Sequence, residues 1–284
     1  MVGLGFDVTT GRIWGYASVA AAIKSFDENG APLSTVPRPG ESADDVDIEF
    51  APEAMTLGST LIPKGTLLFI DGETGSADIY AVDKTTGAVL ATLVTGFGVS
   101  HVVGGAYHAG RNSFFLVQDK VPGAPNGNRI AEVSATSGAV LNTFLVSSFF
   151  SVNYGGLDIN SANGNLFLGS SDEPRVAEVT PSGRFVQYHA LPLGVVSLSG
   201  IGFTEACGEA WVGGTRGAVW RLSGFGGGTV FADLNGDSTV DAADLAILLG
   251  SFSTDDPVAD LDDNETVDGA DLGLLLGAWG TGCA

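Results

Sequence analysis

Basic residues are scarce in this chain of 284 residues. It contains 12 Lys and Arg against 33 Asp and Glu, which gives a formal net charge of −21. Recognition of phosphates needs a basic surface, so the composition argues against a nucleic-acid partner. Apolar runs are short as well, and none approaches the roughly 18 residues that a membrane-spanning helix requires. The sequence therefore predicts a soluble protein without a membrane span.

Cysteine is almost absent. Cys207 and Cys283 are the only two cysteines, which are too few for a disulfide framework or a multi-cysteine metal site. A single bridge between them stays open, because extracellular chains tend to avoid free thiols. The first residues, Met1 to Asp7, lack the basic and apolar regions of a secretory signal and begin within a structural pattern. We therefore expect the start of the chain to be truncated.

Acidic residues are concentrated at one end. The last 56 residues contain twelve Asp or Glu and no Lys, Arg or His, whereas residues 1–228 have a net charge of −9. A Gly-rich stretch over 224–228 separates the two parts, as flexible residues do between domains. This division predicts a large domain over 1–223, a linker over 224–230 and a small domain over 231–284.

The acidic part contains a tandem repeat with an offset of 27 residues. In each copy, oxygen-bearing side chains occupy positions 1, 3, 5, 9 and 12 of a 12-residue loop, and position 7 can supply a carbonyl. A loop of this spacing can surround one Ca²⁺ ion, which takes about six to eight oxygens. The predicted ligands of two calcium ions are Asp233, Asn235, Asp237, Thr239, Asp241 and Asp244, and then Asp260, Asp262, Asn264, Thr266, Asp268 and Asp271.

A short helix is predicted after each loop, because apolar residues recur there with the i, i+3, i+4, i+7 spacing of one helical face. Val240 and Val267, at loop position 8, are expected to be buried where the two loops pair through a short β-bridge. So small a unit buries little apolar surface, so we expect metal binding to be coupled to its folding. The two stripes are Leu245, Leu248, Leu249 and Phe252, and Leu272, Leu275, Leu276 and Trp279.

The region from Asp233 to about Gly280 closely resembles a type I dockerin, a pair of calcium-binding loop-helix repeats. This resemblance implies an extracellular protein that docks onto a cohesin domain of a scaffold or cell surface, commonly in polysaccharide degradation. The sequence departs from the family at loop position 6, where Ser238 and Glu265 replace the usual glycine. It departs also at positions 10 and 11, the usual recognition positions, which read Ala242-Ala243 and Gly269-Ala270. Dockerin-like repeats also occur on secreted proteins of bacteria that have no cellulosome.

The first 223 residues contain recurring β-hairpin patterns. Alternating residues lead into a turn closed by glycine, a residue that tolerates positive φ. A second motif, which begins at Gly3, recurs at Gly156 and Gly200. Together the patterns predict five four-stranded units. The hairpin glycines are Gly30, Gly87, Gly138 and Gly183, and the units start near Gly3, Asp47, Gly104, Gly155 and Ser199.

These units resemble the blades of an NHL, SMP-30 or YVTN-like β-propeller. The predicted fold is therefore an all-β propeller of five or six four-stranded blades, followed by a small all-α calcium-binding domain. Radial repetition explains the recurring units better than the competing β-sandwich does. With a truncated start, a sixth blade or the strand that closes the ring would be missing.

The innermost strands of a propeller line its channel, and the aligned column there reads Gly5, Glu49, Ala106, Asp158 and Gly202. Only Glu49 and Asp158 could act as acid, base or metal ligand. SMP-30-like lactonases use a central metal that needs more converging ligands than this column supplies. We therefore assign no catalytic residue from the sequence, which also contains no Gly-x-Ser-x-Gly elbow, P-loop or His-Glu-x-x-His motif.

The histidines and tryptophans are interpreted mainly as structural. His101 and His108 flank a Gly-rich strand and could be a base or ligands, but loop or partly buried structural roles are commoner. His189 has no evident partner in the sequence. The tryptophans on predicted strands are expected to pack between blades rather than to stack on sugars; they are Trp14, Trp211 and Trp220.

Three functions stay open from the sequence. The favoured one is a secreted, non-catalytic protein whose propeller binds a ligand or partner, such as a carbohydrate, and whose dockerin binds a cohesin-like or other surface protein. The alternative is a carbohydrate-active or lactonase-like hydrolase with its active site at the propeller mouth. The third is a structural surface protein in which both domains only mediate assembly.

Overall fold

The computed structural model describes residues 2–17, 21–40, 44–99, 101–119, 127–204, 208–225, 232–235, 239–262 and 264–280. Strands fill the chain as far as residue 223, and two helices follow, α1 (Ala242–Gly250) and α2 (Gly269–Gly277). The strands are β1 (Val2–Asp7), β2 (Arg12–Ala17), β3 (Ala22–Phe26), β4 (Pro32–Pro37), β5 (Val46–Phe50), β6 (Met55–Leu57), β7 (Thr60–Ile62), β8 (Leu67–Asp71), β9 (Asp78–Val82), β10 (Val89–Val94), β11 (Val102–His108), β12 (Ser113–Gln118), β13 (Arg129–Ser134), β14 (Val140–Leu145), β15 (Leu157–Ile159), β16 (Leu166–Leu168), β17 (Arg175–Val179), β18 (Phe185–Ala190), β19 (Leu198–Phe203), β20 (Glu209–Gly214) and β21 (Val219–Ser223).

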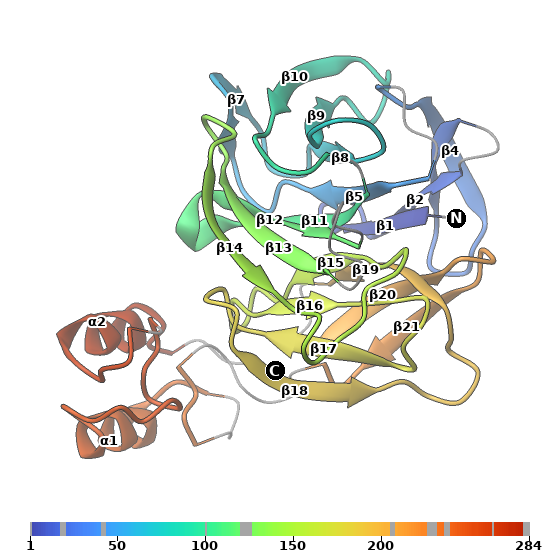
Figure 1. Cartoon of the computed structure of the whole chain (residues 1–284). Helices are drawn as coiled ribbons and strands as arrows, with labels where there is room; N and C mark the ends of the chain where they lie inside the picture. Colours follow the sequence, from blue (N-terminus) through green and yellow to red (C-terminus); the bar gives the residue numbers. More distant parts are fainter. Residues whose placement is uncertain are drawn as a thin grey trace.

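Five sheets are arranged radially as the blades of a propeller (Figure 1). Four of them have four strands each, in the orders β1-β2-β3-β4, β10-β9-β8-β5, β11-β12-β13-β14 and β15-β16-β17-β18, and the fifth has three described strands, β19-β20-β21. The first strand of each blade contacts the first strand of the next, and β19 contacts β1. The innermost strands β1, β5, β11, β15 and β19 therefore form a closed ring.

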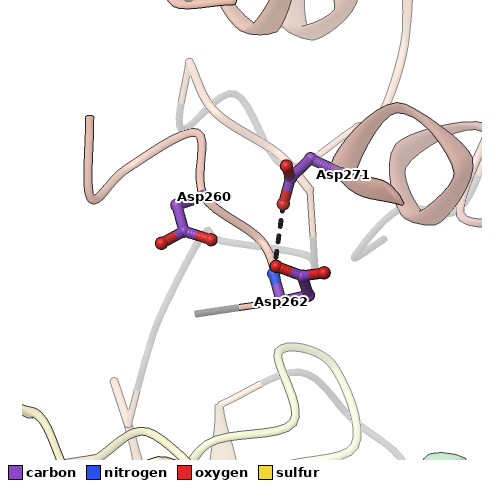
Figure 2. Close-up of side chains that lie close together, drawn as sticks. All are labelled: Asp260, Asp262 and Asp271. Carbon is purple, nitrogen blue, oxygen red and sulfur yellow. Dashed lines mark hydrogen bonds between the residues drawn. The ribbon is translucent and has the colours of Figure 1, made fainter. Parts of the chain in front are cut away.

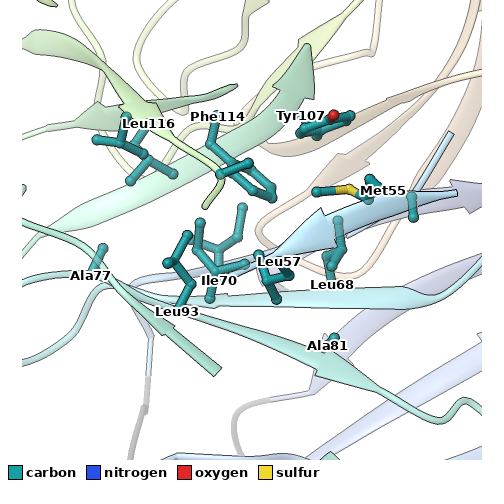
Figure 3. Packing of buried hydrophobic residues seen from close by; sticks show 14 of the residues in the cluster. Met55, Leu57, Leu68, Ile70, Ala77, Ala81, Leu93, Tyr107, Phe114 and Leu116 are labelled. Atoms are coloured by element: carbon teal, nitrogen blue, oxygen red, sulfur yellow. The ribbon is translucent and has the colours of Figure 1, made fainter. Parts of the chain in front are cut away.

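The hydrophobic core is divided among the interfaces between blades. Side chains alternate between the two faces of a strand, so Phe114 and Leu116 of β12 pack toward the second blade, while Phe115 and Val117 pack toward the fourth. Figure 3 shows the cluster between the second and third blades, where Met55 and other side chains fill the space between β8 and β12. Further clusters lie between the remaining neighbouring blades, including the first and the fifth. Each blade is thus buried on both faces.

Glycine permits the close approach of inner strands at the centre of the ring. A Cβ added at Gly156 would lie 2.7 Å from the Cα of Gly200, and one added at Gly200 would lie 2.5 Å from the backbone nitrogen of Leu4. Real Cβ atoms essentially never approach other atoms so closely. Any larger residue would therefore push blades apart.

The prediction of five radial units is confirmed, with blade starts close to the predicted ones, and the β-sandwich alternative is wrong. The predicted hairpin glycines lie in turns and have positive φ values from 69° to 95°. The described residues contain no sixth blade, since the remaining pair of strands, β6 and β7, is a hairpin inserted into the second blade. Among the described residues the fifth blade has three strands, where the sequence predicted four.

The two helices α1 and α2 lie outside the propeller (Figure 1). They pack on each other around a separate cluster made of residues from Ala232 onward. The described helices are too short to span a membrane. A hydrogen bond of 3.3 Å from Nη2 of Arg184 to the carbonyl of Pro257 joins this part to the propeller. The domain boundaries predicted from the sequence stay a prediction.

Half of each predicted apolar stripe is buried. Leu248 and Leu275 are fully buried in the cluster and Leu245 and Leu272 partly so, but the ends of both stripes are exposed, by 43% to 52% of each side chain, at Leu249, Phe252, Leu276 and Trp279. Both helices end before their last stripe residue, at Gly250 and Gly277, so that residue leaves the buried face.

The valines at loop position 8, Val240 and Val267, are buried as predicted. Their described backbone hydrogen bonds do not join the two loops to each other. Val240 accepts a hydrogen bond from Gly280, and Val267 bonds to Ser253 and Thr254. Each valine therefore pairs with the stretch that follows the helix of the other unit. The sequence had predicted a bridge between the two loops instead. Because each loop is tied to the opposite helix, the two units form one core.

Candidate functional site

A pocket of about 280 Å³ opens at one mouth of the propeller channel. Its walls come from the ends of the inner strands and the turns that follow them, because all five strands run in the same direction through the ring. Its described lining combines aromatic and apolar side chains with two carboxyl groups, one lysine and one histidine. The residues are Phe6, Val8, Glu49, Phe50, Pro52, Lys64, Tyr107, His108, Ala109, Gly110, Asp158, Ile159, Ser161, Gly164, Phe203 and Thr204.

Glu49 and Asp158 meet in this pocket, as the channel column of the sequence predicted. Glu49 lies on β5 and accepts a hydrogen bond of 2.6 Å from the backbone N–H of Phe50. Asp158 lies on β15 and accepts bonds of 2.6 Å from the backbone N–H groups of Ile159 and Phe203. The two carboxyl groups are also hydrogen-bonded to each other. Backbone donors on both sides therefore hold the pair in a fixed orientation.

The two carboxyl groups of the pair ionise unequally. Burial raises the pKa of Asp158 to about 6, against hydrogen bonds that lower it. Burial, together with the negative charge of Asp158, raises the pKa of Glu49 well above its ordinary value. Two carboxylates in contact cannot both ionise easily. Asp158 is therefore the member of the pair that ionises first, and Glu49 the member that holds its proton more firmly.

Asp47 is a third carboxyl group of the channel, and the sequence analysis missed its role. It is 1% exposed and accepts backbone hydrogen bonds from Leu4 of β1 at 3.3 Å and Gly105 of β11 at 3.1 Å, and a further one from Leu157 of β15. Burial raises the pKa of Asp47 well above its ordinary value. The sequence did contain a signal for the place of Asp47 in the channel, because Asp47 and Glu49 are two residues apart on a strand and so face the same side. Asp47 joins the amides of three blades to its own strand.

His101 and His108 lie at opposite ends of β11, so they cannot form one site. His108 lines the pocket, and burial lowers its pKa, which keeps the imidazole neutral. Its Nδ1 is buried without a hydrogen-bond partner among the described atoms. His101 is at the far mouth, where Nδ1 lies 2.9 Å from Oδ2 of Asp45. Only His108 is therefore available to a ligand beside the carboxyl pair.

His189 and the tryptophans have structural roles. Nε2 of His189 lies 2.7 Å from Oε2 of the buried Glu178, a partner on the neighbouring strand β17 that the sequence did not reveal. Trp14 and Trp211 are 1% and 6% exposed and Trp220 is partly buried. The prediction that the tryptophans pack between blades is confirmed.

A second cluster lies in the acidic C-terminal part. Asp260, Asp262 and Asp271 bring three carboxylate oxygens within 4.8 Å of one another, and Figure 2 shows the three side chains around the start of α2. Burial and the charges of Asp271 and Asp260 raise the pKa of Asp262. Carboxylates so close repel one another, so a hard cation with oxygen ligands would stabilise this arrangement. The three residues are predicted calcium ligands of the second loop.

Loop position 12 also shapes the backbone of both loops. Asp271 is fully buried, accepts from Leu261 at 2.7 Å and from Asp262 at 3.2 Å, and closes a capping box with Asp268 at the start of α2. In the first loop Asp244 makes the equivalent bonds to Leu234 and Asn235. The predicted ligand Asp237 and the cysteines Cys207 and Cys283 lie outside the described residues. The two loops thus share one construction wherever both are described.

The mouth pocket does not bring together three or more Asp, Glu, His or Cys ligand atoms among the described residues. Among the described residues, the cluster of Asp260, Asp262 and Asp271 is the only group of three or more Asp, Glu, His or Cys side chains whose ligand atoms converge. At the mouth the carboxyl groups of Glu49 and Asp158 are hydrogen-bonded to each other. The donor set of the mouth suits proton transfer.

No protein-family model matches the sequence, and no curated protein is significantly similar to it. Many solved structures share the fold. A luciferin-regenerating enzyme has a TM-score of 0.50 at 12% identity, covering 79% of this chain and 91% of its own. A gluconolactonase from Xanthomonas campestris has a TM-score of 0.49 at 17% identity, covering 78% and 71%. The calcium-binding protein regucalcin from Agrobacterium tumefaciens has a TM-score of 0.49 at 15% identity, covering 78% and 88%. At 12% identity, the likeness to the luciferin-regenerating enzyme shows the fold alone.

Proposed function

We propose that the propeller is a lactonase-like hydrolase with its active site in the mouth pocket. The observation that carries the proposal is the hydrogen-bonded pair of Glu49 and Asp158, which come from two different blades and meet in the pocket wall. A pair of carboxyl groups whose pKa values are pushed apart by their environment supplies an acid and a base at the same pH. The favoured function from the sequence, a non-catalytic binder, does not explain this pair.

The reaction follows from the protonation states. Ionised Asp158 takes a proton from a water molecule as its oxygen attacks the carbonyl carbon of a lactone, while protonated Glu49 donates its proton to the carbonyl oxygen. In the tetrahedral intermediate the carbonyl re-forms, its proton returns to Glu49, and the ring C–O bond breaks. The ring oxygen takes the proton held by Asp158. The product is an open hydroxy acid, and both carboxyl groups regain their starting states.

The spacing of the pair favours lactones or esters over glycosides. Glycosidases hold their two carboxyl groups about 5 Å apart or more, so that a sugar carbon or a water fits between them. Glu49 and Asp158 are in direct hydrogen-bond contact. Such contact suits activation of one water by two groups, as in dyads that share a proton.

Substitution of the pair tests the proposal. We expect Glu49→Gln and Asp158→Asn each to lower kcat/KM for lactone hydrolysis by about 10² to 10⁴-fold, the usual contribution of a general acid or base. Proton release from a panel of lactones, esters and glycosides gives the rate. Glu28→Gln, at an exposed ion pair with Arg221 on the rim of the molecule, is the control. Turnover that survives both substitutions of the pair would contradict the proposed site.

We propose separately that the acidic C-terminal part is a calcium-stabilised docking module, as its resemblance to type I dockerins implies. The convergence of Asp260, Asp262 and Asp271 supports a cation in the second loop. The exposed apolar residues at the ends of α1 and α2 offer a surface for a protein partner. In this proposal the protein is secreted, and the module attaches the hydrolase to a cohesin-like or other surface protein.

Calcium removal tests the module in the full chain. We expect EDTA to abolish the resistance of residues 231–284 to limited proteolysis and to lower helical circular dichroism, while the propeller stays intact, because metal binding and folding of so small a unit are coupled. Asp260→Asn should lower the calcium affinity of its loop about tenfold or more. Asp255→Asn, an exposed aspartate outside the loop positions, is its control. Equal resistance of the tail with and without Ca²⁺ would refute the module.

A further inference from the structure

A ring of large apolar side chains lines the mouth pocket around the carboxyl pair. Each inner strand contributes the residue that directly follows its member of the channel column. Every one of these residues lines the pocket, and all are aromatic except one isoleucine. The five blades therefore share one apolar position at the mouth. We call this set the collar; its members are Phe6, Phe50, Tyr107, Ile159 and Phe203.

The collar is held in place by the hydrophobic core. Each of its members packs in a different one of the clusters between blades. Phe6 and Ile159 are partly buried, and the other three members are between 4% and 8% exposed. The hydroxyl of Tyr107 donates a hydrogen bond of 3.0 Å to Oδ1 of Asn112, so this polar group already has an acceptor. The wall of the pocket is therefore preorganised for an apolar ligand.

The described wall of the pocket offers no cation to an anionic ligand. Lys64 is the only Lys or Arg among the described lining residues, and its ammonium group is already engaged within the protein. Burial lowers the pKa of His108, which keeps the imidazole neutral. Burial and the charge of Glu53 raise the pKa of Tyr107, so a negative charge acts at the wall. A carboxylate inside the collar would lose its water without gaining a partner, which is costly.

We propose that the pocket selects small uncharged lactones with an apolar substituent, and that the collar determines this specificity. The inference rests on the proposed hydrolase and names its substrate class. The carbonyl faces the carboxyl pair, and the substituent packs inside the collar, where its contact with water is replaced by apolar side chains. The volume of about 280 Å³ is at the lower end of ligand pockets, which measure about 300–1,000 Å³. The substrate is therefore a single ring with a short side chain.

Matched substrates test this selection. The probes are γ-butyrolactones whose γ-carbon carries an isobutyl, a carboxymethyl or a dimethylammoniomethyl group, which share one branched shape and differ in charge. At neutral pH we expect kcat/KM to be about tenfold or more higher for the isobutyl lactone than for either charged one. Phe6→Ser, at a partly buried position of the collar, should lower kcat/KM for the isobutyl lactone about tenfold and change that for the carboxymethyl lactone much less.

A cation added at the rim tests the same inference without opening the core. Val8 lines the pocket just beyond β1 and is partly buried. Val8→Lys should raise kcat/KM for the carboxymethyl lactone about tenfold, because the new ammonium group can pair with the carboxylate, whereas Val8→Leu should not. Val94→Lys, on β10 at an exposed position outside the described pocket lining, should change none of the three values. These variants decide the question even where Phe6→Ser fails to fold.

Binding separates this inference from the proposed reaction. The lactams with the same three substituents resist hydrolysis, and calorimetry with the full chain measures their affinity. Tightest binding of the isobutyl lactam, with tighter binding of the carboxymethyl lactam in Val8→Lys, supports the inference even where no lactone is turned over, an outcome that refutes only the hydrolase. Equal affinity for the three lactams, or tighter binding of either charged one to the unmodified chain, would overturn the inference. Normal turnover of lactones would then leave the hydrolase standing.

Discussion

The buried carboxyl groups of the propeller fall into two kinds according to their partners. Asp47, Glu49 and Asp158 face the channel, where burial raises their pKa values and no described cation compensates them. Asp7 is equally buried, but the ammonium group of Lys84 and two threonine hydroxyls outweigh the effect of burial and lower its pKa. In the same way, Arg111 lowers the pKa of the buried Glu132. The channel groups thus reduce stability at neutral pH, while groups of the second kind contribute to it.

Glu49→Gln should therefore stabilise the fold while removing activity. When folding raises the pKa of a carboxyl group, the free energy of unfolding falls as pH rises through the raised pKa. Glutamine retains the shape of protonated Glu49 and can still donate to Asp158. At pH 8 we expect a gain of the order of 1 kcal/mol, or about 2–4 °C in Tm, which shrinks toward zero near pH 4.

Thermal unfolding of both proteins across this pH range, with calcium present, measures the difference. Glu28→Gln is again the control, because Glu28 is half exposed. A Tm of Glu49→Gln below that of the unmodified chain at pH 8 would contradict the assignment of the raised pKa.

Sequence reasoning located the carboxyl pair but not its surroundings. Alignment of repeated strands put Glu49 and Asp158 in one column, because each repeat has the same place in the ring. It could not show that the two side chains touch, since contact depends on the radius of the ring and on the closeness permitted by Gly5 and Gly202. Lys64 was missed because the insertion that carries it breaks the repeat.

At the level of strands, glycine decides how tightly the ring closes. Gly104, Gly156 and Gly200 lie near the beginning of the inner strands β11, β15 and β19, and a side chain at any of them would meet backbone atoms of the neighbouring blade at 2.5–2.7 Å. Sequence analysis recognised two of these residues only as members of a motif. Their function is to leave space for another main chain.

Gly156→Ala should consequently destabilise the propeller. The added Cβ would lie 2.7 Å from the Cα of Gly200, and backbone cannot move aside as a flexible side chain can. We expect a loss of about 2–3 kcal/mol or more in the free energy of unfolding, at the upper end of overpacking effects. Urea unfolding followed by tryptophan fluorescence measures it.

Gly96→Ala is the matched control for this substitution. Its new Cβ would make only ordinary contacts, at 3.7 Å or more, and Gly96 has no positive φ. It should change stability by less than ~1 kcal/mol. Equal effects of the two substitutions would show that close approach at the centre does not limit the ring.

The helices were predicted more accurately than their packing. The 3.6-residue period correctly identified α1 and α2, because amphipathic spacing is a local property of the chain. It overestimated burial at Leu249 and Leu276, since a core between two nine-residue helices cannot cover every apolar residue. The exchange of backbone bonds between the two units depends on their mutual arrangement, which spacing alone does not reveal.

Considered as a whole, the propeller combines the two kinds of carboxyl group with opposite dependence on pH. Groups with lowered pKa values, such as Asp7 and Glu132, stabilise the fold above about pH 4 and lose this effect as pH falls through their lowered pKa. The channel groups begin to destabilise the fold above about pH 4, and the destabilising effect of Asp158 grows until about pH 6. The self-repulsion of a chain with net charge −21 also grows as pH rises.

We therefore expect the free energy of unfolding of the propeller to be largest between about pH 4 and 6. Urea unfolding at pH values from 3 to 9, followed by the fluorescence of the propeller tryptophans, gives the profile. Glu49→Gln should move the maximum toward neutral pH. A maximum at pH 7 or above in the unmodified chain would contradict this reading of the channel.

The contact between β1 and β19 has a consequence for how the chain folds. Leu4 and Gly200 meet there, although almost the whole propeller lies between them in the sequence. Contacts of such long range form slowly, because the entropy of closing a long loop is lost before the contact stabilises anything. The blades can form from neighbouring strands, and the tail helices from residues close in sequence, but the ring is complete only when the first strand and the fifth blade find each other. Closure is therefore expected to limit the folding rate and to expose inner strand edges to association with other chains until it occurs.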